Sequence, residues 1–382
     1  MKKLLFCLPR KIILIMLFIF TSSFANSAPS VSTVTGTVSH GESITVSGSG
    51  FDTKSTAAPL VWDNASGSDP YTLWDGYWPD ETANATYRLD YRTPETVGRG
   101  VAVPHSHVTQ YLCGAHYASD GSNKGYNVAG WQTLSGWSWP VTYYMSWYYR
   151  VDPNWDFPDD NHKWFGYSSG GDIYGLPYNW YLESVGGMES SFGSHLVDDD
   201  SEVGWTTGEW YGNSFPNHPI NQWVKIEVET KISDSTDGYI KVWADGTLVQ
   251  NLTGDTTDGT NYGSEGSNRS IGFGGYNRTR STNQWRYFAD IYFDNTPQRV
   301  VICNNSTYSS CTVREIQIPT AWSDTSITAT VNAGVFASDA TAYLFVVDAD
   351  GVASAGKEIT FGEGAGSTII KKIMTFFRRL RG

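Results

Sequence analysis

The sequence predicts an all-β protein in which one β-sandwich is inserted into a smaller one. The 382 residues include 16 Trp, 23 Tyr and 39 Gly but only 17% charged residues. Short β-branched and aromatic runs alternate with turn residues, which is typical of strands. Residues 29–54 look like the opening hairpin of a small immunoglobulin-like domain, and residues 321–361 look like its closing strands. The long stretch between them has a different sequence pattern and is predicted to be an inserted domain, which we call the cargo.

The N-terminal segment 1–27 predicts export to the medium or the cell envelope. Basic residues such as Lys2 and Arg10 precede an apolar run from Ile12 to Phe20, and small residues at 25–27 suit cleavage. A spanning helix needs about 20 apolar residues, so this run is too short to stay as an anchor.

Charge is unevenly distributed along the chain. The formal net charge is −13; it becomes −17 without the four basic residues of segment 1–27, and −22 without the five basic residues of 368–382. The part of the chain between these two basic segments is therefore strongly acidic. Nucleic acid is not an expected partner, because binding phosphates needs a basic face. Residues 362–382 read as a flexible linker and a basic amphipathic tail, which either contacts a membrane surface or is a frayed end.

Three cysteines remain after segment 1–27. Cys303 and Cys311 bracket a short loop, and export permits disulfides, so we expect these two to pair and to clamp the return of the chain. Cys113 is expected to be a buried, unpaired small hydrophobe.

The two ends carry the smaller sandwich. Val34, Val38, Ile44 and Val46 alternate along two strands, and residues 39–42 form the turn between them. The run from Gly41 to Phe51 follows the pattern G-x-x-I-T-V-x-G-x-G-F and resembles the start of an IPT/TIG domain. This resemblance implies an immunoglobulin-like sandwich of residues 29–57 and 301–361, a spacer or binding module without catalytic residues. If the halves pair, Val46 should lie beside the Ile327 strand.

Calcium and other cofactors have weak support. Asp348-Ala349-Asp350-Gly351 begins like a calcium loop, but Ile359 stands where the twelfth-position Glu should be, so a hairpin turn is the better interpretation. Asp198 to Asp200 is either a structural calcium loop or a solvated acidic turn. No cofactor is required by any motif.

The cargo, residues 58–300, contains alternating strands. Along 143–151, the residues Tyr143, Met145, Trp147, Tyr149 and Val151 form an apolar face. Residues 223–229 alternate in the same way, with Val224, Ile226 and Val228 inward. Asp245-Gly246 then predicts a two-residue hairpin turn, and 286–294 is a further strand.

Residues 222–227 and the hairpin at 237–246 resemble the concanavalin-A-like lectin/glucanase superfamily. Jelly-roll polysaccharide lyases and laminin-G-type modules share this strand and hairpin. The resemblance implies a jelly-roll sandwich, but binders and enzymes share that fold.

The second face of these strands is rich in aromatic and charged residues. Flat rings can stack on sugars while charged groups bond hydroxyls, so we predict an exported, lectin-like protein that binds a polysaccharide or surface glycan on a concave face. An ordinary solvated face is the competing interpretation. The predicted glycan-binding residues are Tyr144, Tyr148, Arg150, Trp223, Lys225, Glu227, Tyr239, Lys241, Trp243 and Arg286.

Two other functions stay open. A polysaccharide lyase needs a base, an acid and a cation beside the substrate carboxylate, and the candidates are His105, His107, His162, Tyr148 and Arg150. A glycoside hydrolase is less favoured, because the paired carboxylate motif of jelly-roll glucanases is absent. A structural or adhesive surface protein would instead have the predicted concave face flat or covered by loops.

Overall fold

A computed structural model of the chain describes residues 28–74, 76–79, 89–116, 127–132, 142–153, 162–168, 180–184, 192–196, 222–231, 233, 235–254, 270–275 and 283–362. These residues are almost entirely β, with one α-helix, Pro94–Val97, and 3-10 turns at Pro70–Thr72 and Tyr308–Ser310. The predicted all-β class is confirmed. In the described part of the chain, no helix is long and apolar enough to cross a membrane. The expected export segment, 1–27, and nearly all of the basic tail lie outside the described residues.

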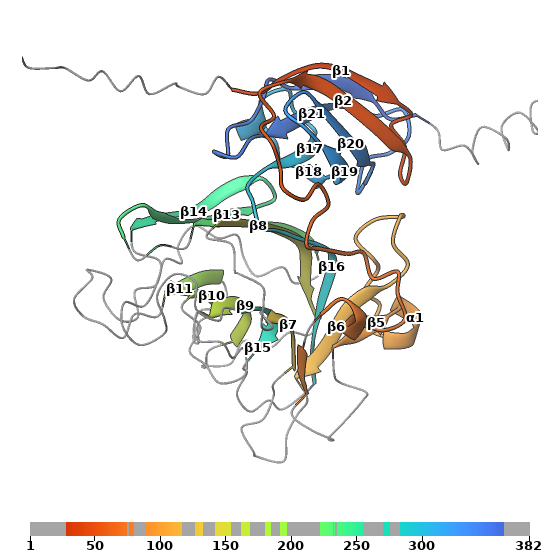
Figure 1. The fold of residues 1–382 in the computed structure, drawn as a ribbon. Helices are drawn as coiled ribbons and strands as arrows, with labels where there is room; N and C mark the ends of the chain where they lie inside the picture. The colour runs from red at the N-terminus through yellow and green to blue at the C-terminus, as the bar shows by residue number, and fades with distance from the viewer. Residues whose placement is uncertain are drawn as a thin grey trace, which may run out of the picture.

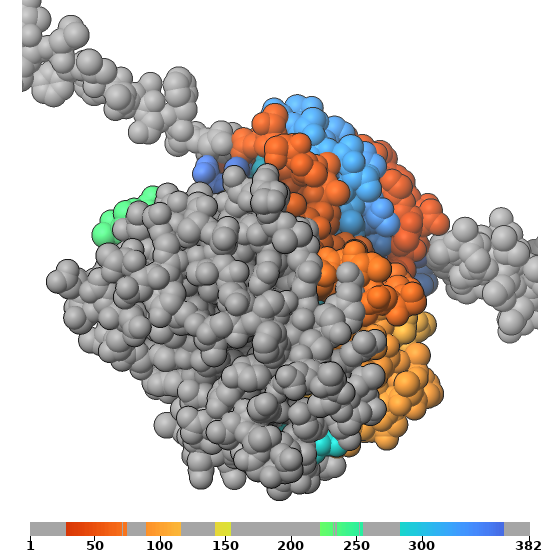
Figure 2. All heavy atoms as spheres, turned by 60° about the horizontal axis from the view of Figure 1, so that its bottom comes forward, coloured from red at the N-terminus to blue at the C-terminus, as the bar shows by residue number. Residues whose placement is uncertain are grey.

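The smaller sandwich joins strands from both ends of the chain (Figures 1 and 2). Val46 lies opposite Ile327, so an N-terminal strand and a C-terminal strand are neighbours in one sheet. Its two sheets share a core that includes Ile44, Phe51 and Leu344. The first sheet is β1 (Ser30–Gly36), β2 (Ser43–Ser49), β20 (Ser326–Thr330) and β19 (Ile318–Trp322), and the second is β18 (Arg314–Ile316), β17 (Arg299–Cys303), β21 (Thr341–Val347) and β22 (Lys357–Thr360).

The larger sandwich consists of an eight-stranded and a six-stranded sheet. The eight-stranded sheet runs between the other two layers in Figure 1. In order, it contains β14 (Thr247–Gly254), β13 (Gly238–Ala244), β12 (Val224–Lys231), β8 (Thr142–Val151), β16 (Gln284–Asp294), β6 (Tyr111–His116) and β5 (Asp90–Arg92), with β3 (Val61–Asp63) paired to β16. The six-stranded sheet contains β11 (Phe192–Leu196), β10 (Trp180–Ser184), β9 (His162–Ser168), β15 (Ser270–Gly275), β7 (Asn127–Gln132) and β4 (Gly76–Pro79).

Alternation along β8 and β12 places the main core where the sequence predicts it. Tyr143, Met145 and Trp147 are fully buried on one face of β8, and Ile226 and Val228 meet them from β12. Each large apolar side chain buried in this way contributes roughly 1.5–3 kcal/mol. The Asp245-Gly246 turn between β13 and β14 is confirmed as well: both residues have positive φ, 44° and 70°, as a type I′ turn requires.

A β-bulge in β16 overturns the placement of Arg286. Ala289 pairs with Tyr148 and Tyr292 with Ser146, so three steps on β16 match two on β8. The extra residue, Asp290, has φ 48°. Because one inserted residue exchanges the two faces, Arg286 pairs with Val151 and lies on the core face rather than on the predicted binding face.

The chain leaves and re-enters the smaller sandwich at one point. Lys54, on the outgoing segment, forms a buried ion pair with Asp294 at the end of the returning β16. Gln298 then donates a hydrogen bond of 3.0 Å from Nε2 to the Phe51 carbonyl. Burial lowers the pKa of Lys54 and raises the pKa of Asp294, and the contact between them opposes both shifts. The Lys54–Asp294 ion pair and the Gln298 hydrogen bond together hold the crossing.

The cysteines are free thiols, which contradicts the expected Cys303–Cys311 bridge. Both are buried in one apolar cluster, where the two thiols are hydrogen-bonded to each other, and Cys311 Sγ also lies 3.5 Å from the Thr307 carbonyl oxygen. The packing of this cluster, rather than a covalent bond, fixes the loop. Cys113 is fully buried and free, as predicted.

Breaking the crossing pair should destabilise the fold strongly. In Lys54→Met, Asp294 stays buried without its cation, a loss of the kind that costs about 3–5 kcal/mol. Urea unfolding followed by circular dichroism measures this loss. The matched control is Lys231→Met, whose partner Asp237 is exposed, so its unfolding midpoint should hardly move. Equal losses in the two variants would contradict a special role for the crossing pair.

Candidate functional site

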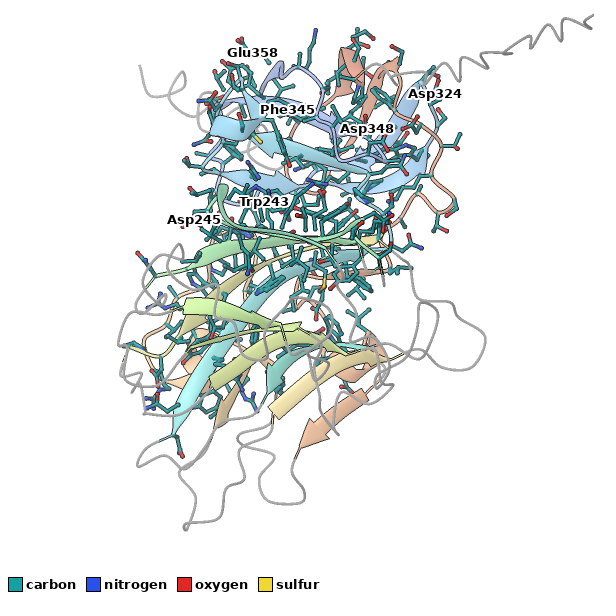
Figure 3. The ribbon with its side chains drawn as sticks, turned by 90° about the vertical axis from the view of Figure 1, so that its left-hand side faces the viewer. Trp243, Asp245, Asp324, Phe345, Asp348 and Glu358 are labelled. Carbon is teal, nitrogen blue, oxygen red and sulfur yellow. The ribbon has the colours of Figure 1, made fainter. Side chains whose placement is uncertain are left out.

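The predicted binding face of the eight-stranded sheet is covered by the smaller sandwich. Tyr144, a predicted sugar platform, is 1% exposed and packs in an apolar cluster with residues of both sandwiches. In Figure 3 the layers meet along this face, with Trp243 and Asp245 at the boundary. We call the contact between the outer face of the eight-stranded sheet and the smaller sandwich the seam. The expectation of an open groove here is wrong. The other members of the cluster are Tyr292, Val301, Cys303, Cys311, Ile316 and Phe345.

Ion pairs across the seam engage the charged residues of this face. Glu227 Oε2 accepts a 3.0 Å hydrogen bond from Arg314 Nη1, and its Oε1 accepts a 2.7 Å bond from the Tyr144 hydroxyl. Glu229 lies 3.0 Å from both Arg299 and Lys241. Because these carboxylates are buried and already bonded, Glu227 is a docking residue of the seam rather than a sugar ligand.

Tyr148 and Lys225 are also committed to the seam. The Tyr148 hydroxyl donates to Glu315 of the smaller sandwich, and Lys225 Nζ lies 3.5 Å from the other Glu315 oxygen. The same ammonium lies 4.2 Å from the centre of the Tyr148 ring. Burial, followed by the charge of Glu315, raises the pKa of Tyr148 well above its usual range. A phenol in this state is not poised to exchange protons.

The remaining predicted residues are only half-buried. Trp223 donates from Nε1 to the Ala102 carbonyl at 2.8 Å, and Trp243 lies 5.9 Å from the guanidinium of Arg314. The Lys241 ammonium lies over the Tyr239 ring, and Arg150 is half-buried next to the Tyr287 position. These side chains follow the edge of the seam and do not line one continuous groove.

The histidine candidates do not form one catalytic centre. His105 is buried and shares a 2.8 Å hydrogen bond with Asp290, whose carboxylate also accepts from Asn332 of the smaller sandwich at 3.3 Å. Its ring meets Tyr148 edge-on with centres 5.7 Å apart, but the polar atoms of both are used elsewhere. His107 stacks on His40 of the smaller sandwich at 4.2 Å. His162 lies in β9 of the other sheet. The expected grouping of these histidines with Tyr148 and Arg150 is therefore not found.

The six-stranded sheet carries a feature that the sequence alone does not reveal. Gly166, Gly272, Gly130 and Gly76 follow one another on the four neighbouring strands β9, β15, β7 and β4, each directly opposite the next. We call these four residues the glycine row. In the same register row, β10 and β11 contribute Tyr181 and His195. Along this one row, four consecutive strands carry no side chain.

The two faces of this sheet differ in residue type. Alternation assigns the glycine row to one face, together with Ser168, Ser270 and Gln132 on one side of it and Val128 and Trp78 on the other. The opposite face has residues typical of a core, and that face is the one expected to cover the apolar core of the eight-stranded sheet. We infer that the glycine row lies on the outer face. The core-type residues are Phe165, Tyr167, Ile271, Phe273, Ala129, Trp131, Trp180 and Leu182.

The described residues offer no metal site. Among them, no group of three or more His, Cys, Asp or Glu could hold an ion. Asp348 uses Oδ1 to accept from the Asp350 and Val352 amides at 3.0 and 2.8 Å, which confirms the predicted turn. The other calcium candidate, 198–200, lies outside the described residues.

The solved structures that resemble this chain are distant in sequence and in fold. No family model and no curated protein matches the chain. The chain is similar to alginate lyase Aly36B, with 12% identity, a TM-score of 0.43, and coverage of 63% of this chain and 97% of that one. It is also similar to an endo-beta-1,4-glucuronan lyase from the fungus Trichoderma reesei, with 12% identity, a TM-score of 0.41, and coverage of 58% and 91%. A third similar structure is the catalytic domain of a glycoside hydrolase family 131 protein from Coprinopsis cinerea. Its identity is 13%, its TM-score is 0.36, and the match covers 63% of this chain and 94% of that one. Likeness at this level assigns no activity.

The stacked histidines should make the seam sensitive to acid. Burial lowers the pKa of His40 and His107 below 6.5, partly opposed by Asp290 and reinforced by neighbouring histidines. A lowered folded-state pKa means that the folded protein binds protons less readily than the unfolded chain. Stability is therefore complete above pH 6.5 and falls as the pH drops below it.

The free energy of unfolding measured in urea at pH 7.5 and 5.5 tests this effect. The wild type should lose stability on acidification, and the double variant His40→Phe/His107→Phe, which keeps two stacked rings, should lose less. The stability lost on acidification by each single variant should lie between the losses of the wild type and the double variant. Parallel pH curves for wild type and double variant would rule out the stacked pair as the cause.

Proposed function

We propose that the protein binds a polysaccharide along the glycine row of the six-stranded sheet. The observation that supports this is the run of four glycines opposite one another across β9, β15, β7 and β4. Glycine weakens a strand, and it often marks the place where a ligand or another backbone approaches closely. Four in one row form a flat strip that crosses the strands.

The dimensions of the strip suit an extended polymer. Neighbouring strands lie about 4.8 Å apart, so the full row from His195 in β11 to Gly76 in β4 spans about 24 Å. Residue types that bond hydroxyls, Ser168, Ser270 and Gln132, occupy the adjacent row of the same face. This role moves the predicted polysaccharide site from the eight-stranded to the six-stranded sheet.

Filling the row should abolish binding without unfolding the protein. Gly272→Leu places a bulky side chain at the middle of the strip, so retention in polysaccharide affinity gels should fall at least tenfold. The matched control is Thr35→Leu, the same kind of change at an exposed strand position of β1. If both variants are retained like the wild type, the glycine row is not the site. If the wild type is retained by no polymer, the structural or adhesive function takes its place.

A second function, β-elimination by a polysaccharide lyase, is favoured by one specific observation. Tyr181 and His195 are direct cross-strand neighbours at the end of the glycine row, and Lys163 pairs with Glu183 in the same sheet. Directly opposite residues have Cβ atoms about 4.5–5.5 Å apart. A phenol and an imidazole at that separation can supply an acid and a base, and Lys163 can supply a cation for the substrate carboxylate.

Absorbance at 235 nm, where the unsaturated uronate product absorbs, separates the two functions. A lyase should produce a rising signal with alginate or a glucuronan, and Tyr181→Phe and His195→Gln should each reduce the rate by at least a hundredfold while retention persists. His162→Gln, in the same sheet but outside this row, is the control. Retention by the wild type with no rise in absorbance would leave binding as the function.

We also infer the setting in which this site works. Residues 29–57 and 301–361 would form an IPT/TIG-like support, with 58–300 as its cargo, and segment 1–27 would direct export. The basic residues of the tail, 362–382, would provide contact with an anionic membrane surface. A structural calcium ion would need ligands outside the described residues.

A further inference from the structure

A cavity of about 410 Å³ opens at the edge of the seam, between β12 of the larger sandwich and the 312–314 segment of the smaller one. Its volume lies in the range of about 300–1,000 Å³ that is usual for small-molecule sites. We propose that this cavity binds a single neutral sugar ring. The residues that carry the argument are Tyr148, Trp223, Lys225, Asp245, Arg314 and Val335.

Two buried cations at the cavity have hydrogen-bonding capacity left over. Lys225 and Arg314 are 5% and 4% exposed. Among the described residues, neither Lys225 Nζ nor Arg314 Nε has a hydrogen-bond partner. Buried donors are normally satisfied, and leaving one without an acceptor costs about 1–3 kcal/mol. Both atoms are enclosed, and Lys225 Nζ also lies 3.5 Å from Glu315 Oε2, so ligand oxygens would supply acceptors once these side chains turn toward the cavity.

The acceptors around the cavity select a hydroxyl-rich ligand over an acidic one. Asp245 lines the cavity, and only its Oδ1 is engaged, by the Lys225 amide at 2.9 Å. Behind Lys225, the buried Glu315 Oε2 has no hydrogen bond within the described structure. Glu227 is paired with Arg314, so the carboxylates are those of Asp245, Glu315 and Glu227 and the cations are Lys225 and Arg314. Because the carboxylates outnumber the cations, a ligand carboxylate would be repelled. A hydroxyl both donates and accepts, and it suits this mixture.

An aromatic wall completes the site. Trp223 is half-buried and held in place by the 2.8 Å bond from its Nε1 to the Ala102 carbonyl. That bond uses the polar edge of the indole, and Tyr111 and Tyr287 lie against the ring with centres 6.1 and 6.4 Å away, so the part of the ring that lines the cavity is what remains for a ligand. The apolar side chains of Pro104, Val313 and Val335 lie around the same cavity. A sugar ring, with polar edges and C–H faces, matches walls of this kind.

The cavity is independent of the glycine row. It lies against the outer face of the eight-stranded sheet, whereas the row belongs to the six-stranded sheet. The two sandwiches each contribute part of its lining, so it exists only in the assembled chain. Its volume of about 410 Å³ suits one sugar ring, for example a chain end, better than the interior of a polymer.

Calorimetric titration of the full-length protein with methyl glucopyranoside, methyl galactopyranoside and methyl mannopyranoside tests the proposal, with glucuronate as the acidic comparison. We expect at least one neutral glycoside to bind with a dissociation constant in the millimolar range or below, and glucuronate to bind at least tenfold more weakly. Val335→Trp should fill the mouth and weaken binding at least tenfold. Val335 is 45% exposed, so this change should leave the fold intact.

The matched control is Val352→Trp, since Val352 is also 45% exposed and belongs to the smaller sandwich but not to the cavity lining. It should bind the glycoside like the wild type. Failure of every neutral glycoside to bind, tighter binding of glucuronate, or unchanged binding in Val335→Trp would overturn the proposal. Val335→Trp should still be retained by polysaccharide gels like the wild type. This measurement tests the glycine row separately, so a failure of the cavity proposal can be told apart from a failure of the glycine-row proposal.

Discussion

The buried charges of the seam are the constraint on which the rest of the structure depends. Glu227 and Glu229 of the larger sandwich face Arg314 and Arg299 of the smaller one, and Lys225 faces Glu315 in the opposite sense. Removing one member of a pair while the seam stays closed would leave a buried charge without its partner, which costs far more than an exposed pair contributes. The outer face of the eight-stranded sheet is therefore built to dock, and any polymer site has to lie elsewhere.

The insertion itself works because its two ends are close together. Lys54 and Asp294 meet at the crossing although a whole sandwich separates them in the chain. An inserted domain with adjacent ends does not require the strands of its host to separate, so the core around Ile44 and Leu344 forms as in an uninterrupted sandwich. The seam then orients the inserted sandwich with its six-stranded sheet on the far side from the smaller one (Figure 1).

Local patterns in the sequence predicted the strands, but they did not predict what covers each face of those strands. Alternation along β8 correctly identified Tyr143 to Val151 as core, because a period of two needs no knowledge of the rest of the fold. The opposite face, with Tyr144 and Tyr148, looks the same whether water, sugar or another domain covers it. The bulge at Asp290 was equally hidden, and it reversed the face of Arg286. The glycine row needs the register of four strands between Gly76 and Gly272, which no single segment contains.

The negative net charge of the chain favours one of the two functions proposed for the glycine row over the other. A uronic-acid polymer carries a carboxylate on every ring, and the chain between segment 1–27 and the basic tail has a net charge of −22. Long-range repulsion would slow its approach unless a local cluster of cations offset it. At the end of the row, Lys163 occupies the ladder position opposite Glu183, and His195 adds positive charge when it is protonated. A neutral polysaccharide meets no such barrier, so binding of an uncharged glycan is the simpler use of this face, and elimination would rely on Lys163 to offset the substrate carboxylate.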